Sequence, residues 1–454
     1  MNFKNKKVLV CGMARSGISA AKLLNFANAF VTLQDLKSLD NLKKIYDIDS
    51  LQKEGISIYA GSNPDDIINK MDIIVLSPGI PSDLDFILKA ESLNIPVISE
   101  IELAYMFTKC PVIAITGTNG KTTTTTLVGE ILKSQYKNVE IVGNIGIPYS
   151  EKILNFNDKG VIVAEISSFQ LEKIKTFRPN ISAVLNITPD HLDRHKTFEN
   201  YISAKEKIFE NQTKEDYCIL NFDDENCFNM ALKTNSNVIF FSSNKILEKG
   251  IYIEEDNIVL KLDNIEQKII NINDLQILGK HNYENVMVAI AICFIFNISI
   301  DNIIKVLKNF RGVEHRIEYV DTIDYVDYYN DSKGTNTDAA IQAVLAMRKP
   351  IVLIAGGYDK GSNYDELIKT FENRVKHIIL IGETAEKIKD TCIKYNFNNF
   401  NICNNLNEAL EKARNIAKKG DCVLLSPACA SWGMFKDYEQ RGICFKNIVK
   451  SFNN

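Results

Sequence analysis

A glycine-rich segment, Gly117–Thr123, carries the residue types that bind phosphate groups. It follows an apolar run, Val112–Thr116, that is typical of a strand, and it leads into a helical pattern. Glycines let backbone N–H groups surround an anion, Lys121 can reach the outer phosphates, and the Thr122 hydroxyl can ligate Mg²⁺. Because Ile115 replaces the usual first glycine, we expect a shortened phosphate loop rather than an ordinary turn into a helix.

Carboxylate and imidazole groups follow the next two predicted strands. Glu165 ends the apolar run Val161–Glu165, while Asp190 and His191 come shortly after Ile181–Leu185. Sites in α/β proteins lie at the carboxyl ends of strands. A lone glutamate such as Glu165 is more often a surface residue or a helix cap, and His191 alone would be a packed or solvated histidine as often as a ligand. Beside a phosphate loop, however, they suit a nucleotide-bound Mg²⁺, which needs one or two protein carboxylates.

The elements that position these residues alternate between short apolar runs and helical patterns, which predicts the α/β fold class with parallel sheets. Three series begin at Lys7–Cys11, Pro111–Ile115 and Tyr325–Tyr329. A chain of 454 residues also exceeds a single ordinary core. We therefore predict three domains at 1–98, 99–312 and 313–454. Other predicted elements are the strands Phe30–Leu33, Met71–Leu76, Tyr217–Leu220, Ile351–Ile354, His377–Ile381 and Asp421–Leu425, and the helices Ser16–Phe26 and Asn282–Phe296.

The bulk composition excludes several classes of protein. Hydrophobic residues at 45% and charged residues at 24% are typical of a globular chain, and a net charge of -4 provides no field for wrapping nucleic acid or lying on an anionic membrane. The 10 cysteines show no zinc-type pairs, so most should be buried apolar residues. The apolar runs Val8–Met13 and Val286–Phe296 are too short for a signal peptide or a membrane span, which favours the cytoplasm.

Taken together, the motifs resemble the Mur ligase superfamily, the ATP-dependent amide-forming enzymes of peptidoglycan precursor synthesis. The phosphate loop and the segment Asn186–Asp193 are the marks of that superfamily. The resemblance extends over essentially the whole chain. Further matching segments are Gly143–Gly146, Gly279–Asn285, His315–Arg316 and Asn330–Asn336.

Within the superfamily, three segments are similar to members that add D-glutamate to UDP-N-acetylmuramoyl-L-alanine: Ser77–Gly79, Glu100–Leu103 and Leu425–Gly442. The resemblance implies a Rossmann-like N-terminal domain for the UDP-sugar, a central P-loop ATPase domain and a Rossmann-like C-terminal domain for the amino acid. It implies that ATP phosphorylates the substrate carboxylate, that the glutamate amine attacks the acyl phosphate, and that ADP and phosphate are released. The expected protein is a cytoplasmic monomer that uses ATP as co-substrate and two Mg²⁺ ions.

The resemblance also implies roles for individual residues. The catalytic set would be Lys121, Glu165, His191, Lys205 and Lys333, and the metal ligands would be Thr122, Glu165, His191 and Lys205 as a carbamate. A free ammonium could not lie beside two cations, whereas carbamylation of Lys205 produces an anionic oxygen ligand. Without the resemblance, Lys205 would be interpreted as an exposed lysine on an amphipathic helix beside Lys207.

Two further sets of contacts are implied for the nucleotide and the amino acid. The ATP set comprises Gly117, Thr118, Asn119, Gly120, Lys121, Thr122, Thr123, Asn282, Arg316 and Asp331. The D-glutamate set comprises Thr335, Lys360, Ser431, Trp432 and Tyr438. Trp432-Gly433 and Tyr438 stand where other members often carry Leu-Asp and Phe, so the shape of the amino-acid pocket stays open. A helix start, an ion pair and a solvated loop are the alternative roles for Asn282, Arg316 and Lys333.

The segment Gly12–Gly17, with Asp35 at the end of the second predicted strand, is similar to a dinucleotide-binding fingerprint. Ala14 argues against that interpretation, because its methyl group restricts the approach of a pyrophosphate. The superfamily instead uses this loop for the UDP diphosphate. UDP-sugar contacts are therefore expected from Arg15, Ser16, Asp35, Asn144 and His191.

Three hypotheses stay open from the sequence. The chain is a D-glutamate-adding ligase, a sister ligase such as a folylpolyglutamate-forming one, or a protein of another class, either a nicotinamide-dependent dehydrogenase or a nucleotide-binding regulator. The first is favoured because a nucleotide-sugar domain and the Ser426–Ser431 segment would be unexpected in the second. Since the implied ATP contacts are divided between two domains, we also expect ligands to favour a closed arrangement.

Overall fold

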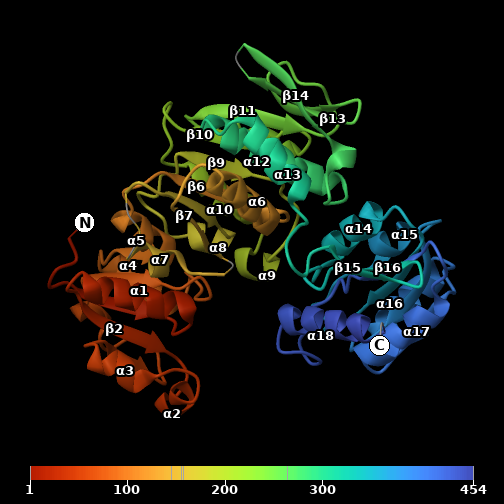
Figure 1. Ribbon diagram of the computed structural model, residues 1–454. Coiled ribbons are helices and arrows are strands. Elements are labelled where there is room, and N and C mark those ends of the chain that lie inside the picture. The colour runs from red at the N-terminus through yellow and green to blue at the C-terminus, as the bar shows by residue number, and fades with distance from the viewer. Residues whose placement is uncertain (1, 145, 155, 157, 263, 453–454) are drawn as a thin grey trace. The chain divides into compact units, whose positions relative to one another are not determined.

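The computed structural model describes residues 2–144, 146–154, 156, 158–262 and 264–452 (Figure 1). Ile145, inside the predicted Gly143–Gly146 motif, lies outside the described residues. The chain divides into two compact units, Met1–Ile270 with Asn285–Ile304, and Asn271–Glu284 with Lys305–Asn454.

The first sheet is parallel throughout and lies in the first unit, red to orange in Figure 1. Its strand order among the described residues is β3-β2-β1-β4-β5. The order therefore switches from one side of β1 to the other between β3 and β4, and α/β sheets place ligand crevices at such a switch point, here between β1 and β4. The strands are β1 (Lys7–Cys11), β2 (Phe30–Asp35), β3 (Ser57–Ala60), β4 (Ile73–Leu76) and β5 (Val97–Ser99). The helices are α1 (Arg15–Phe26), α2 (Leu39–Lys43), α3 (Ile48–Lys53), α4 (Asp85–Ser92) and α5 (Glu100–Phe107), with the 3-10 turn Ile68–Lys70.

A larger sheet follows with the order β14-β13-β12-β11-β10-β9-β6-β8-β7 over the described residues. Its parallel part contains β6 (Val112–Thr116), β7 (Val139–Gly143), β8 (Val161–Glu165), β9 (Ile181–Val184), β10 (Tyr217–Asn221) and β11 (Asn237–Ser242). Beyond these lie β12 (Gly250–Glu254), β13 (Asn257–Leu262) and β14 (Ile265–Asn271), of which β12 and β13 are antiparallel. The sequence pattern did not predict these last three strands.

Short and long helices connect the strands of this larger sheet or, in the case of the last two, follow its final strand. They are α6 (Lys121–Lys133), α7 (Tyr149–Ile153), α8 (Ser168–Leu171), α9 (Leu192–His195), α10 (Phe198–Glu206), α11 (Glu225–Met230), α12 (Lys280–Ile295) and α13 (Ile300–Asn309), with 3-10 turns at Lys207–Phe209 and Ile272–Asp274. Because β6 lies between β8 and β9, the loops that follow these three strands meet at one edge of the sheet. That edge carries the phosphate loop.

The third sheet belongs to the second unit and has the order β15-β16-β20-β17-β18-β19 in the described part of the chain. All its observed pairs are parallel except β15 with β16. The strands are β15 (Glu318–Ile323), β16 (Val326–Asn330), β17 (Ile351–Ala355), β18 (Val375–Leu380), β19 (Phe400–Ile402) and β20 (Cys422–Leu425). The helices are α14 (Thr337–Ala346), α15 (Asp365–Lys369), α16 (Ala385–Lys394), α17 (Leu406–Ile416) and α18 (Tyr438–Ser451). The predicted α/β class is confirmed.

The first two sheets share one hydrophobic core. Val8 and Val10 of β1 belong to the same buried cluster as Val112 and Ala114 of β6. Helices α1, α5 and α7 pack against one another between the two sheets. The first unit thus combines what the sequence analysis treats as two domains, and the boundaries at 98 and 312 stay predictions.

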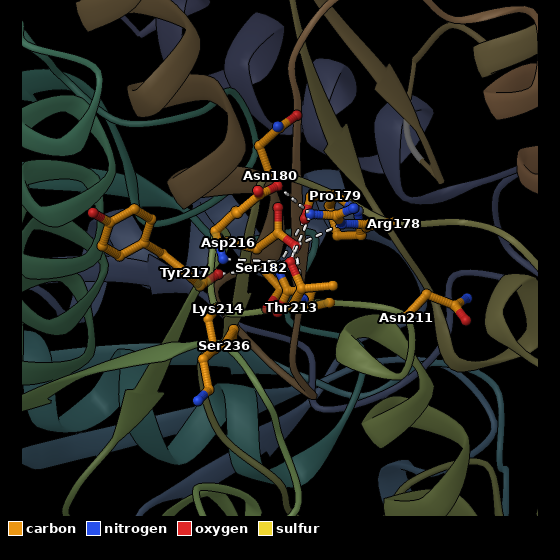
Figure 2. A network of polar contacts seen from close by, with 12 residues as sticks. Arg178, Pro179, Asn180, Ser182, Asn211, Thr213, Lys214, Asp216, Tyr217 and Ser236 are labelled. Carbon is orange, nitrogen blue, oxygen red and sulfur yellow. Dashed lines mark hydrogen bonds and ion pairs between the residues drawn. The ribbon is translucent and has the colours of Figure 1, made fainter.

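A polar network joins the amino ends of β9 and β10 (Figure 2). The phosphate loop follows the carboxyl end of β6, so it lies at the opposite end of the strands. Arg178 donates through Nε to Asp216 at 2.7 Å and through Nη2 to Thr213 at 2.7 Å. The backbone N–H of Thr213 donates to the same Asp216 carboxylate at 2.8 Å. Asn180, just before β9, accepts a hydrogen bond from the backbone N–H of Val112 at 3.0 Å. The network therefore has a structural role at the amino ends of these strands, whereas the candidate site lies at their carboxyl ends.

The cysteines and the long apolar stretch have structural explanations. All ten cysteines are free thiols, and every one except the half-buried Cys444 is buried, as expected for small apolar side chains. The apolar stretch Val286–Phe296 falls in and just after α12, whose residues Val286–Cys293 are fully buried. Among the described residues, no helix combines the length and apolar character required to cross a membrane.

Candidate active site

The phosphate loop has the predicted strand–loop–helix context, between β6 and α6. Gly117 and Gly120 have φ values of 151° and 86°, which L-residues with side chains rarely adopt. A Cβ at Gly120 would collide with Oδ1 of Asn285, and one at Gly117 would lie 3.0 Å from Cβ of Leu185. Both glycines are therefore required by conformation and by space.

Residues of the Asn186–Asp193 motif hold this loop in place. The Asn186 side chain accepts from the Asn119 N–H at 2.8 Å and donates to the Asn119 carbonyl at 3.2 Å. The Thr118 hydroxyl contacts the carbonyl of Thr188 and the hydroxyl of Tyr201, each at 3.0 Å. The motif was expected to bind metal and substrate, and the role of Asn186 in holding the loop was not predicted from the sequence.

The basic and hydroxyl groups of the loop are partly enclosed. Nζ of Lys121 donates to the carbonyls of Gly117 and Thr118, both at 2.7 Å. Thr122 and Thr123, at the start of α6, are buried at 8% and 2% exposure. Helix α6 begins immediately after Gly120, so its first backbone N–H groups and its positive dipole end lie at the loop.

Glu165 lies beside the loop because of strand register. β8 is the neighbour of β6, and Glu165 pairs with Ile115. The Glu165 side chain is only 2% exposed, and its Oε1 accepts from Nδ2 of Asn144 at 3.2 Å. The Asn144 N–H also donates to the Glu165 carbonyl at 2.8 Å. The structure therefore brings together two residues that the sequence analysis assigned to different ligands.

Lys205 is buried at 2% exposure, which contradicts its alternative interpretation as an exposed lysine on an amphipathic helix. Its Nζ donates to the Gly117 carbonyl at 2.9 Å and to Oγ1 of Thr116 at 3.3 Å. The ammonium also lies 4.8 Å from the ring centroid of Tyr201. Burial, together with the nearby charge of Lys121, lowers the Lys205 pKa well below its usual value.

His191 adopts a left-handed conformation, φ 54°, at the start of α9. Its N–H donates to Oδ1 of Asp190 at 2.9 Å, and its Nε2 lies 3.5 Å from Oδ2 of the same residue. The ring meets the ring of Phe169 edge to face, with centroids 4.9 Å apart. The side chain is 50% exposed, so the imidazole is accessible to a ligand.

The loop after β1 lies close to the same region of the first unit. Nη1 of Arg15 donates to the carbonyl of Gly146 at 3.4 Å. Asp35, at the end of β2, accepts from the N–H of Met13 at 3.0 Å. Ser16 is the second residue of α1 and is half-buried. Arg15 and Asn144 thus lie on neighbouring loops, as a shared ligand would require.

In the second unit, the loops that carry the predicted ATP and catalytic residues Arg316, Asp331 and Lys333 contact one another. Asp331 follows β16 and is 3% exposed, and it accepts from Oγ of Ser426 at 2.6 Å and from the N–H of Ile317 at 3.3 Å. Burial raises its pKa to about 7. The Lys333 N–H donates to the carbonyl of His315, next to Arg316, at 3.0 Å. Asn282 lies in the first turn of α12, where its Nδ2 donates to the carbonyl of Leu278 at 2.7 Å.

The residues predicted to bind D-glutamate fall into two contact groups. Nζ of Lys360 lies 5.4 Å from the ring centroid of Trp432, which in turn packs against Tyr358 at 5.5 Å. Nζ of Lys333 lies 5.6 Å from the ring centroid of Tyr438. Ser431 is buried, and Thr335 donates through its N–H to the Lys333 carbonyl at 2.9 Å. Trp432 is 54% exposed, so its indole is available to form a pocket wall.

Arg441 connects the loops that carry these groups, and the sequence analysis did not assign it a role. Its guanidinium is 1% exposed and donates to the Ser332 hydroxyl at 2.9 Å, the Ser332 carbonyl at 2.8 Å and the Cys429 carbonyl at 3.2 Å. Burial lowers its pKa to about 10. The sequence did contain a signal for this role, because Arg441 falls on the face of α18 that is buried. A buried charge requires hydrogen-bond partners, so such an arginine is expected to bind neighbouring loops.

The donor set at the phosphate loop fits Mg²⁺ in part. Mg²⁺ prefers oxygen ligands, and the Thr122 hydroxyl and the Glu165 carboxylate provide them. His191 offers a nitrogen, which is a less usual ligand for this ion. The ammonium of Lys205 does not fit a cation site, whereas the oxygen atoms of a carbamate would.

This fold and this site define a Mur ligase. Family descriptions match all three regions: a Mur ligase MurD-like N-terminal domain over residues 6–99, a Mur ligase middle domain over 115–293, and a Mur ligase glutamate ligase domain over 315–429. The chain belongs to the Mur ligase family.

Within the family, curated relatives carry one particular name. UDP-N-acetylmuramoylalanine--D-glutamate ligase from Lachnoclostridium phytofermentans is 49% identical over 454 residues and covers 100% of both chains. The protein of the same name from Thermoanaerobacter pseudethanolicus is 48% identical over 99% of each chain, and that from Clostridioides difficile is 46% identical over 99% of this chain.

Solved structures support the fold. A UDP-N-acetylmuramate-alanine ligase from Thermotoga maritima covers 98% of this chain with a TM-score of 0.60 at 21% identity. A pseudomurein peptide ligase type C from Methanothermus fervidus covers 98% with a TM-score of 0.58 at 21% identity.

Proposed function

We propose that this chain is an ATP-dependent ligase that joins D-glutamate to UDP-N-acetylmuramoyl-L-alanine in peptidoglycan precursor synthesis. The observation that carries the proposal is full-length identity of 44–49% to ligases named for this reaction, combined with an intact phosphate loop beside Glu165 and Lys205. The protein acts on small molecules, as a monomer in the cytoplasm.

The first half-reaction transfers the γ-phosphoryl group of ATP to the alanine carboxylate, which forms an acyl phosphate and ADP. Lys121 and the N–H groups of the phosphate loop hold the phosphates in line with the carboxylate, because positioning and charge neutralisation supply most of the catalysis in phosphoryl transfer. Mg²⁺, when bound, supplies further neutralisation of the phosphate oxygens. Thr122, Glu165, His191 and a carbamylated Lys205 would hold it.

Burial of Lys205 explains how a carbamate could form. The lowered pKa increases the neutral fraction of the amine, and the neutral amine attacks CO₂ to form a carbamate with release of one proton. The product has a negative charge beside the phosphate loop and the Lys121 ammonium, so the site stabilises it once formed.

The second half-reaction begins when the D-glutamate amine attacks the acyl carbonyl. The tetrahedral intermediate collapses, phosphate leaves, and the nitrogen loses a proton to give the amide. Lys360 and the hydroxyls of Thr335 and Ser431 would bind the carboxylates of glutamate, since a cation with hydroxyl donors suits a dicarboxylate. The rings of Trp432 and Tyr438 would line the pocket, while Arg316, Asp331 and Asn282 would contact ATP.

The test is phosphate release from ATP by the purified chain. We expect release only when UDP-N-acetylmuramoyl-L-alanine and D-glutamate are both present, with the amide product detected by mass spectrometry. Turnover with L-glutamate, another amino acid or a folate in place of D-glutamate would favour a sister ligase. Hydride transfer to a nicotinamide nucleotide, or ATP binding without turnover, would favour the remaining hypotheses.

A further inference from the structure

We propose that Arg194 is a positioning residue. It holds the loops of the first sheet that are expected to bind the UDP-sugar in a fixed position relative to His191 and the phosphate loop. The inference rests on the proposed function, because it concerns how that substrate is bound. Arg194 lies on α9, three residues after His191, and its side chain is 16% exposed.

The guanidinium of Arg194 contacts three residues on two loops. Nη1 donates to the carbonyl of Pro78 at 3.0 Å, and Nη2 donates to the carbonyl of Ile80 at 3.0 Å. Nη2 also forms an ion pair with Oε2 of Glu172 at 3.0 Å. Pro78 and Ile80 follow β4 of the first sheet, whereas Glu172 follows α8 of the second. One side chain therefore joins loops from both sheets.

The loop that Arg194 holds is in contact with the glycine loop assigned to UDP. Oγ of Ser77 donates to the carbonyl of Gly12 at 3.0 Å. A Cβ at Gly12 would lie 3.1 Å from Cγ1 of Ile80, so the two loops are closely packed. A displacement of Pro78–Ile80 would consequently disturb the backbone that is expected to surround the UDP diphosphate.

Arg194 also belongs to a group of side chains around Phe169 that determines where His191 lies. The ring of Phe169 has the Arg194 guanidinium 4.2 Å from its centroid, the His195 ring stacked at 5.3 Å, and the His191 ring edge-on at 4.9 Å. His195 also meets Oγ of Ser168 at 2.9 Å. Three basic residues of one short segment thus surround a single aromatic ring, which fixes the orientation of α9.

Little space exists for an alternative arrangement. The cavity beside Arg194, which Ser77, Ser99 and Glu172 help to line, has a volume of only about 10 Å³, the size of a single water. The planar guanidinium satisfies three oxygen acceptors in fixed directions, and a lysine cannot reproduce that geometry. The role therefore depends on the shape of arginine and not only on its charge.

The experiment compares Arg194→Lys with Arg178→Lys. Arg178 is a matched control, since it also pairs with a carboxylate in the first unit (Figure 2), but near the amino ends of the strands of the second sheet. Binding of UDP-N-acetylmuramoyl-L-alanine is measured by calorimetry without ATP or Mg²⁺, binding of ATP is measured separately, and unfolding temperatures are recorded for each variant.

We expect Arg194→Lys to raise the Kd of the UDP substrate about tenfold, to lower kcat, and to leave the Kd of ATP within about twofold. Arg178→Lys should lower the unfolding temperature without changing either Kd. Glu172→Gln, which keeps the side-chain shape and the backbone contacts of Arg194, should give a smaller rise in the same Kd.

A UDP-substrate Kd within twofold of the wild type in Arg194→Lys, or an equal rise in Arg178→Lys, overturns the inference while the wild-type ligase activity stands. A wild-type chain that does not bind UDP-N-acetylmuramoyl-L-alanine overturns the proposed function, and the inference with it.

Discussion

At the scale of single residues, Lys205 illustrates how burial changes the chemistry of a lysine. A solvated lysine is a cation at neutral pH, but Lys205 is buried and has two oxygen acceptors, an aromatic ring and the nearby Lys121 around it. The desolvation cost falls on the charged form, so the amine becomes available as a nucleophile.

Replacing Lys205 with alanine should remove most of the ligase activity, because the proposed carbamate oxygens are lost. Added short carboxylates such as acetate or formate should restore part of it by occupying the same space. Phosphate release is the measurement. Lys233→Ala, at an exposed ion pair with Glu206 in the same unit, is the matched control and should retain activity without rescue. Full activity of Lys205→Ala would rule out the carbamate.

Asp331 should make stability depend on pH. Its pKa is raised to about 7 by burial, above the value of about 4 in an unfolded chain. The folded state then binds more protons between these values, so the free energy of unfolding should fall as pH rises from about 4 to about 7 and then level off. The loss is of order 4 kcal/mol for a shift of this size.

Chemical denaturation across that pH range measures this effect. Asp331→Asn, which stays neutral, should flatten the profile, whereas Asp324→Asn at an exposed ion pair with Arg414 should not. An unchanged slope in Asp331→Asn would show that other groups carry the pH dependence.

At the scale of elements, the phosphate loop depends on how closely it approaches α12. Gly120→Ala should raise the Kd of ATP by about tenfold or more, because the new methyl group would collide with Asn285 in addition to the strain of a positive φ. Calorimetric titration with ATP measures the effect. Gly420→Ala is the matched control, since Gly420 has φ 92° and open space around its Cβ position. An equal Kd of ATP in the two variants would show that the collision with Asn285 does not affect ATP binding.

The sequence predicted the loop glycines and several parallel strands, such as β1, β6 and β8, because apolar runs and glycine spacing are local signals. The parallel strands β3, β5, β7, β11 and β19 were not predicted. β8 matches its predicted range, Val161–Glu165. The strands β12–β14 were missed, since their residues alternate irregularly and β14 carries Glu266 and Lys268 on exposed positions. Asn186, Arg194 and Arg441 were missed for another reason. Their roles depend on backbone carbonyls and amides of distant loops, which no local pattern encodes.

At the scale of the whole molecule, the proposed ATP contacts are divided between the two units. The phosphate loop belongs to the first, and Asn282, Arg316 and Asp331 belong to the second. A ligand that contacts both must stabilise arrangements in which both are within reach.

We therefore expect ATP together with UDP-N-acetylmuramoyl-L-alanine to reduce the radius of gyration measured by small-angle X-ray scattering. Arg316→Ala should weaken the reduction by ATP while leaving binding of the UDP substrate unchanged. An identical scattering profile with and without ligands would contradict the expectation.

The strand order has a consequence for synthesis on the ribosome. The first sheet uses only residues 7–99, so its strands can pair as soon as that segment has emerged. β6 emerges next, but its neighbours are β8 and β9, and the loop clamp at Asn186 lies further along the chain. Pairing over such separations is slow. A nascent chain should therefore pair the strands of its first sheet well before it can bind ATP, and in the interval the apolar strand β6 is a segment for chaperones to protect.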